Sequence, residues 1–271
     1  MPEMPDLEVI AEVLQRKLGG VTILGAEVLK PIVVRNLTGE SLPQCLAGQG
    51  LCRVSRRGKF LLLALDGGDW LVVNPMRSGR LRLLTEDESV HGKPHFSLRF
   101  MDGSTLQYSD ADRMGKIYVT HNLDMVPTFT SLGPEALSPG VTLPVFTERL
   151  SSRRGEIKGV LTNQTFVAGI GNAYADEILY RAGIYPFRKS PSLGKDELGR
   201  LHQAMVAVLQ DAVDTLRVRV GEAIHLEIRD FLQVHGRGGE PCLRCGSKIS
   251  TVSARGRITN FCRNCQPGRM T

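Results

Sequence analysis

The chain has 271 residues, of which 42% are hydrophobic and 23% charged, a composition typical of one or two folded domains and not of a disordered protein. A net charge of +6 is too modest to establish nucleic-acid binding by itself. No run of about 18 apolar residues and no secretory signal pattern occurs, and the sequence predicts a cytoplasmic protein without a membrane partner.

Apolar periodicity predicts an amphipathic helix over residues 6–18, with Asp6 as its N-cap and Gly19-Gly20 as its stop. Short strand-like runs follow it, and the Asp102-Gly103 dipeptide between two of them is a strong hairpin signal. The runs cover 21–28, 51–57, 59–65, 70–74, 80–84, 95–101 and 104–108. Several short strands separated by turns predict a β-sandwich or a barrel.

A change in amino-acid composition divides the chain after the predicted strands. Residues 126–142 are rich in Pro, Gly, Ser and Thr, which predicts a linker between a β-domain over 1–125 and a helical domain over 143–230. Helical patterns cover 144–152, 155–163, 172–182 and about 194–218. Residues 231–271 form a separate, basic module, since seven Lys or Arg residues face a single acid after Val234.

Six cysteines fall into two groups. Four of them form two C-x2-C pairs, the spacing of a closed tetrahedral site for one structural Zn²⁺: Cys242, Cys245, Cys262 and Cys265. A redox pair or two disulfides are the alternatives. Cys45 and Cys52 lie in apolar segments and are expected to be reduced core residues.

Two further patterns favour nucleic-acid binding. The segments 249–252 and 257–261 can pair as a short ribbon whose tip, Arg255 to Arg257, either inserts into a groove or is a solvated turn. Gly169-Ile-Gly-Asn172 ends one helix and opens another that Asn172 can cap, and the exposed N–H groups there can bind phosphate. A plain helix corner is the alternative for this second pattern.

Taken in order, these motifs resemble one known family. They are Met-Pro-Glu-x-Pro at the start, Arg56-Arg57-Gly58-Lys59 on a strand, Gly169-Ile-Gly-Asn172, and the four-cysteine ribbon with Gly256-Arg257-Ile-Thr. The set is similar to the formamidopyrimidine-DNA glycosylase/endonuclease VIII family of base-excision repair enzymes, nearly end to end. The resemblance implies an α+β multidomain fold: an N-terminal catalytic β-sandwich with an N-terminal helix, a helix-two-turn-helix domain, and a zinc ribbon. Damaged or abasic double-stranded DNA would lie in the cleft between the domains of a monomer.

The resemblance also implies catalytic roles. Pro2, once Met1 is removed, matches the nucleophile whose secondary amine forms a Schiff base with the sugar C1′. Glu3 matches a proton-transfer group, and Lys59 matches a lysine that contacts phosphate near the lesion. A helix-capping acid is the alternative for Glu3, and a surface charge is the alternative for Lys59.

Further positions match DNA contacts of the family. Phosphate-binding positions are matched by Lys158, Asn172 and Arg257, while Asn74 replaces a phosphate-contacting His and Arg113 is expected to face the orphaned base. The void left by the flipped base has three candidate fillers, because the usual Met and Phe wedges are changed here. These candidates are Met76, Arg77 and Met114.

A second departure concerns lesion choice. The family's long, Gly-rich loop that caps 8-oxoguanine has little room in residues 220–229. The sequence therefore predicts a bifunctional glycosylase and AP lyase with weak preference for 8-oxoguanine. The alternatives are a non-catalytic lesion- or DNA-binding protein, and an AP lyase with little base excision.

Overall fold

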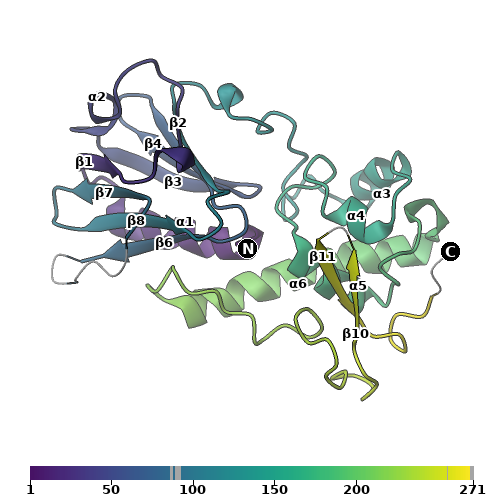
Figure 1. The fold of residues 1–271 in the computed structure, drawn as a ribbon. Coiled ribbons are helices and arrows are strands. Elements are labelled where there is room, and N and C mark those ends of the chain that lie inside the picture. Colours follow the sequence, from purple (N-terminus) through teal and green to yellow (C-terminus); the bar gives the residue numbers. More distant parts are fainter. Residues whose placement is uncertain (86–87, 89–92, 255, 269–271) are drawn as a thin grey trace. The chain divides into compact units, whose positions relative to one another are not determined.

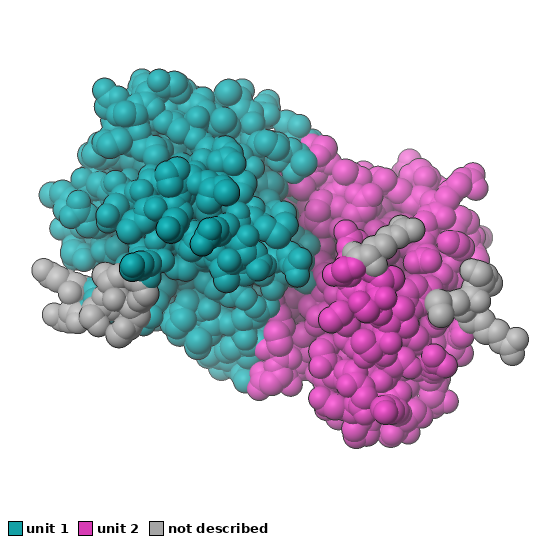
Figure 2. Space-filling view, in the orientation of Figure 1, with its two compact units in different colours: residues 1–130, 215–228 teal, residues 131–214, 229–271 magenta. Residues whose placement is uncertain are grey.

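The computed structural model describes residues 1–85, 88, 93–254 and 256–268, so Arg255 at the expected ribbon tip lies outside the described residues. The chain divides into two compact units, coloured separately in Figure 2. The first unit contains residues 1–130 and 215–228, and the second contains 131–214 and 229–271. The segment after the long helix therefore belongs with the N-terminal unit.

Among its described residues, the first unit contains two sheets, two complete helices, two 3₁₀ turns and the end of the long helix α6 (Lys195–Val220). Figure 1 shows their arrangement. The helices are α1 (Met4–Leu18) and α2 (Leu42–Leu46), and the 3₁₀ turns are η1 (Pro31–Val33) and η2 (Leu123–Met125). One sheet has the order β1-β7-β8-β6, built from β1 (Ile23–Val28), β6 (Gly79–Leu84), β7 (Phe96–Phe100) and β8 (Thr105–Asp110). The other has the order β2-β9-β5-β4-β3, built from β2 (Val34–Asn36), β3 (Leu51–Arg57), β4 (Phe60–Leu65), β5 (Trp70–Asn74) and β9 (Lys116–Thr120).

The strand pattern explains how the sheets form. The apolar run of β4 is buried on both faces of its strand, and β4 pairs with β3 on one side and β5 on the other. Gly103 has a φ of +84°, which suits the tight turn between the antiparallel strands β7 and β8. The predicted hairpin and the β-domain are confirmed, whereas the short strands β2 and β9 were not foreseen.

Helix α1 packs against β3 and begins two residues earlier than the sequence predicted. Its N-cap is Glu3, and Asp6 is the third residue of the helix. The Asp6 carboxylate accepts a hydrogen bond from the Glu3 N–H at 2.8 Å, as in a capping box. The prediction of Asp6 as N-cap was therefore wrong, because an acid at the third position can face back to the cap.

The second unit is helical and ends in a ribbon. It contains α3 (Leu143–Ser151), α4 (Ile157–Leu161), η3 (Ser190–Ser192), α5 (Asn172–Ala182) and most of α6 (Lys195–Val220), followed by the antiparallel strands β10 (Ser250–Ala254) and β11 (Arg257–Phe261). The predicted helices and ribbon are confirmed, with α4 shorter than expected. Within the described residues, none of the helices is both long and apolar enough to cross a membrane.

The two cysteines outside the C-terminal cluster differ in burial. Cys45 is 1% exposed and lies in the core as expected. Cys52 is exposed, so its prediction as a core residue was wrong. Cys52 lies where the pairing of β3 with β4 shifts register between Leu51 and Arg53, and its neighbour Leu51 is buried.

Candidate functional site

The N-terminus leads into α1 from a buried position. Pro2 is buried and Glu3 is 1% exposed, although Met1 before them is partly exposed. Glu3 occupies the N-cap position of α1, as the alternative interpretation of this residue as a helix-capping acid expected. Glu3 also follows Pro2 directly in the chain, so helix capping and proton transfer are compatible roles for this residue.

Pro2 lines a pocket within the first unit. The other walls come from Asp6 and Leu7 of α1, from β6, and from the segment 224–227 after α6. Glu227 of this segment forms an ion pair with the N-terminal ammonium of Met1, with 2.9 Å between Met1 N and Glu227 Oε1. Its other carboxylate oxygen pairs with Arg80 of β6. A charged pair therefore stands beside the predicted nucleophile.

Lys59 lies in the two-residue turn between β3 and β4, not on a strand as predicted. Gly58 has a φ of +58°, a conformation that glycine adopts without steric cost. Arg56 fixes this turn to α1, since its Nε donates to Glu8 at 2.6 Å and its Nη1 donates to the Gly58 carbonyl at 3.2 Å. Lys59 is thus presented at the end of a hairpin that is anchored to the N-terminal helix.

The loops that carry the void-filling candidates are joined by one buried carboxylate. Asp110 is 1% exposed and accepts hydrogen bonds from Ser78 of one loop and from the Gly115 N–H of the other, the latter at 2.7 Å. Burial alone raises the pKa of Asp110, but these hydrogen bonds outweigh it and hold the pKa below its usual value. The Asp112 N–H also donates to the Ser78 hydroxyl at 2.9 Å.

The tips of these two loops present apolar and charged side chains to solvent. Met76 is 38% exposed and Met114 is 43% exposed. Met76 and Arg113 have positive φ angles of 50° and 55°, a conformation that costs energy for residues with a Cβ. Arg77 lies 3.9 Å from Asp112, and this exposed pair stabilises the fold little. The structure therefore brings Met76, Arg77, Arg113 and Met114 together, with Asn74 at the base of the first loop.

In the second unit, Lys158 of α4 lies at a junction between helices and ribbon. Its ammonium is 2.6 Å from the Asp176 carboxylate of α5, and it donates to the Ile258 carbonyl and the Thr259 hydroxyl of β11, both at 2.9 Å. Its side chain is 9% exposed and that of Asp176 is fully buried. These three acceptors place the charge of Lys158 inside the unit.

Asn172 meets the same strand. It is the first residue of α5, and Gly171 is the N-cap, so the prediction that Asn172 caps this helix was wrong. Its amide instead donates to the Ile258 carbonyl at 2.7 Å. Gly169 has a φ of +99°, as expected for a glycine at a sharp turn. Lys158 and Asn172 therefore bind the residue next to the exposed Arg257, and all three predicted phosphate-binding positions gather at the start of β11.

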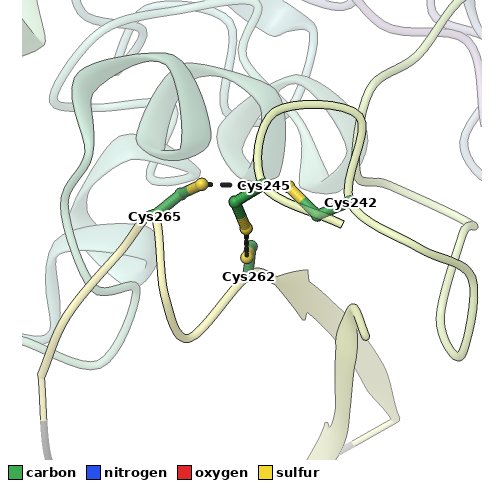
Figure 3. A group of neighbouring side chains, drawn as sticks. All are labelled: Cys242, Cys245, Cys262 and Cys265. Carbon is green, nitrogen blue, oxygen red and sulfur yellow. Dashed lines mark hydrogen bonds between the residues drawn. The ribbon is translucent and has the colours of Figure 1, made fainter. Parts of the chain in front are cut away.

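The four C-terminal cysteines lie around one point, and Figure 3 shows their side chains turned toward one another. All four sulfur atoms lie within 4.8 Å of each other, and the Cys242–Cys265 and Cys245–Cys262 distances are 3.8 and 3.5 Å. A tetrahedral Zn²⁺ with bonds of about 2.3 Å needs sulfurs roughly 3.8 Å apart. Hydrogen bonds from Ser247 and Asn264 lower the pKa of the Cys245 thiol to about 5, which favours the thiolate that binds metal.

Helix α5 supports this cluster from behind. The Tyr180 hydroxyl lies 3.1 Å from the Cys242 sulfur, within hydrogen-bonding distance of a ligand thiolate. The Arg244 guanidinium lies 4.1 Å above the Tyr180 ring and donates to the Tyr180 carbonyl at 2.9 Å. Such contacts behind the ligands orient them, so the donor set and its surroundings fit one structural Zn²⁺.

Sequence reasoning missed two acids next to the helix start. The Asp176 carboxylate binds His235 Nδ1 at 2.7 Å and the Asn260 N–H at 3.1 Å, in addition to Lys158. Glu177 accepts from the N–H groups of residues 233–235 at 2.8–2.9 Å. The signal in the sequence was an adjacent pair of acids within a helical segment rich in apolar residues. Glu227 and Arg80 of the first unit were missed as well.

Comparison with known families covers most of the chain. Residues 1–117 match the formamidopyrimidine-DNA glycosylase N-terminal domain, and residues 132–221 match the formamidopyrimidine-DNA glycosylase H2TH domain. Residues 239–268 match a zinc finger found in FPG and IleRS.

Individual relatives match this chain over nearly the whole length of both proteins. The formamidopyrimidine-DNA glycosylase of Geobacillus kaustophilus is 38% identical over 98% of this chain and 100% of its own, and that of Pelotomaculum thermopropionicum is 35% identical over 98% and 99%. Among solved structures, the Lactococcus lactis Fpg in complex with DNA containing an abasic site has a TM-score of 0.88 at 31% identity, covering 98% of this chain and 100% of that chain. The same enzyme bound to DNA containing Fapy-dG also has a TM-score of 0.88.

Proposed function

Because the chain belongs to the formamidopyrimidine-DNA glycosylase family, whose members are DNA glycosylases and AP lyases of base-excision repair, we propose that it excises oxidised bases through the Pro2 amine. The observation that carries this proposal is the position of Pro2. It is buried at the wall of a pocket, directly before the acid that begins α1. Removal of Met1 exposes a secondary amine at that point.

The chemistry needs a neutral amine and a route for protons. An ordinary α-amine with a pKa of about 7.7–8.0 is roughly a tenth to a sixth neutral at pH 7. Its lone pair attacks C1′, the bond from C1′ to the base breaks, and the base leaves with the electron pair and takes up a proton. The amine then loses its own hydrogen as a proton, and opening of the sugar ring gives a cationic iminium between Pro2 and C1′.

Glu3 is the proton-transfer residue in this proposal. It donates a proton to the ring oxygen as the C1′–O4′ bond breaks, and as a carboxylate it assists the β- and δ-eliminations that cut the strand on both sides of the lesion. Glu3 is buried at the N-cap of α1 and follows Pro2 directly in the chain, which supports this role.

DNA contacts follow the predicted positions in each unit. In the β-domain, Lys59 and Asn74 contact the DNA backbone. At the start of β11, Arg257 contacts a phosphate, and Lys158 and Asn172 hold the adjacent Ile258 carbonyl. Arg113, Met76, Arg77 and Met114 lie on the two joined loops, where a side chain can fill the space of a flipped base. Contacts to the DNA backbone should dominate the affinity, so binding should fall steeply with salt. Zn²⁺ holds the ribbon folded and takes no part in the chemical steps.

Lesion choice follows from residues 220–229, which occupy the position of a longer capping loop. We expect weak activity on 8-oxoguanine, and better activity on formamidopyrimidines, oxidised pyrimidines, hydantoins and abasic sites, because 8-oxoguanine loses the hydrogen bonds of that loop. Cleavage of duplexes that carry 8-oxoguanine or dihydrouracil opposite C or G tests this expectation. Fast and selective release of 8-oxoguanine contradicts it.

Borohydride trapping separates the candidate functions. Reduction of the iminium leaves a covalent protein–DNA adduct, which we expect with both lesion-containing and abasic duplexes. An adduct with abasic DNA alone supports an AP lyase with little base excision. No adduct from protein that lacks Met1 supports a non-catalytic DNA-binding protein, which keeps the fold and the zinc site but not the reaction.

A further inference from the structure

The N-terminal amine has a charged neighbour that the sequence did not reveal. Glu227 lies in the segment 221–228 after α6, more than 200 residues from Met1, yet its Oε1 is 2.9 Å from the Met1 nitrogen. The side chains of Met1 and Glu227 are 32% and 28% exposed, so the pair lies at the rim of the pocket that Pro2 lines. Strand β6 supplies Arg80, which pairs with the other oxygen of Glu227.

The segment that carries Glu227 is fastened to the first unit at several points. Arg217 binds Glu12 of α1 through two nitrogens, at 2.6 and 2.9 Å. Lys17 of α1 lies 2.6 Å from Glu222. Ile224 is 2% exposed and closes the pocket from this side. Two ion pairs and a buried apolar anchor therefore precede Glu227 and hold its segment against the first unit.

We propose that Glu227 is a further catalytic residue, whose carboxylate binds the Pro2 nitrogen after Met1 is removed and stabilises the positive charge that this nitrogen carries in the iminium. The proposal rests on Pro2 being the nucleophile. Removal of Met1 moves the amine by about 3.8 Å, the spacing of consecutive residues along the backbone. A glutamate side chain follows a shift of this size by changing rotamer.

The charge balance shows when Glu227 acts. The nitrogen attacks C1′ as a neutral amine, loses its hydrogen as a proton after the bond has formed, and becomes positive again when its lone pair makes the C1′=N bond. A carboxylate beside the nitrogen stabilises this late charge by electrostatic attraction. Asp6 also lines the pocket, but its carboxylate accepts the Glu3 N–H, whereas Glu227 is the acid that pairs with the N-terminal amine.

The test compares Glu227→Gln with a matched variant on the same segment. Glu222→Gln also removes a carboxylate that pairs with a cation of α1, but its partners are the side chains of Arg16 and Lys17, not the amine. The rate of adduct formation with borohydride is measured in single turnover on a duplex with an abasic site, so that base excision plays no part. The pH is about 9, where an ordinary α-amine is mostly neutral in every variant.

We expect Glu227→Gln to slow adduct formation by roughly three- to tenfold, the range for a partly exposed charge pair. Glu227→Asp keeps the negative charge on a shorter side chain and should slow adduct formation less than Glu227→Gln does. Glu222→Gln should stay within about twofold of the unaltered protein, and binding of a duplex with a non-reactive tetrahydrofuran abasic analogue should be equal in all variants.

Two results overturn the assignment of Glu227. One is an unaltered rate in Glu227→Gln, and the other is an equal loss in Glu222→Gln, which means that fastening of the segment and not the charge sets the rate. Melting temperatures of both variants show whether they are folded. Absence of any adduct from the unaltered, Met1-free protein is a different outcome, since it contradicts Pro2 as nucleophile.

Discussion

Replacement of Asp176 by Asn tests the buried junction between α4, α5 and β11. The carboxylate of Asp176 is fully buried and binds Lys158 at 2.6 Å, His235 at 2.7 Å and the Asn260 N–H at 3.1 Å. Asn is nearly the same size and still accepts one hydrogen bond. The substitution therefore removes the negative charge while it leaves the packing of α5 almost unchanged.

The expected loss of stability follows from the positive charge of Lys158, which remains buried. The Lys158 side chain is only 9% exposed, so the ammonium stays buried without its counter-charge. Breaking a buried ion pair by removing one partner costs about 3–5 kcal/mol. The Ile258 carbonyl and Thr259 hydroxyl still accept hydrogen bonds from Lys158, so we expect a value near the lower end, about 3 kcal/mol.

Hydrogen exchange of the amides in α5 and β11 measures this loss in the second unit, because a single unfolding free energy is poorly defined for a chain with two units. The only tryptophan, Trp70, lies on β5 of the first unit, and its fluorescence serves as an internal control that should not change. The double variant Asp176→Asn with Lys158→Met should recover much of the stability, since it buries neither charge alone. A loss below about 1 kcal/mol, or strictly additive effects in the double variant, refutes the reasoning.

Three further predictions follow from the zinc site, the joined loops and the ribbon. Chelation of Zn²⁺ should unfold residues 239–268 and weaken DNA binding, as shown by proteolysis and by titration with DNA, and readdition of Zn²⁺ should restore both. Gly115→Ala places a Cβ 1.8 Å from the Tyr108 hydroxyl and should cost about 1–3 kcal/mol in thermal unfolding, whereas Gly159→Ala, with no atom within 4 Å, should not destabilise. Arg257→Ala should weaken binding to all duplexes alike and reduce the slope of log K against log salt by about 1; loss of affinity for one sequence only speaks against a phosphate contact.

The features that the sequence predicted depend on neighbouring residues. Two C-x2-C pairs define a metal site through their spacing, and each pair needs only one tight turn. The Asp102-Gly103 turn and the helical periods of α3, α5 and α6 are local in the same sense. The family resemblance added the roles of Pro2 and Glu3, which no periodic pattern indicates.

The features that were missed depend on contacts between distant residues. Asp176 and Glu177 bind backbone groups 56 to 84 positions away, and Glu227 meets the amine across 226 positions. No spacing in the sequence carries such information. Local predictions also failed where the sequence allows two assignments. The acids Glu3 and Asp6 both suit an N-cap, and the turn between β3 and β4 is only two residues long, so Lys59 could be assigned to the turn or to the strand.

The most direct test of the account combines trapping with mass spectrometry of the N-terminus. An amide bond to Met1 blocks the Pro2 nitrogen, so attack by Pro2 requires an active preparation without Met1. We expect the intact mass to show its removal, and peptide mapping of the borohydride adduct to place the DNA remnant on Pro2. An active preparation that retains Met1, or an adduct on any other residue, contradicts the central claim that Pro2 is the nucleophile.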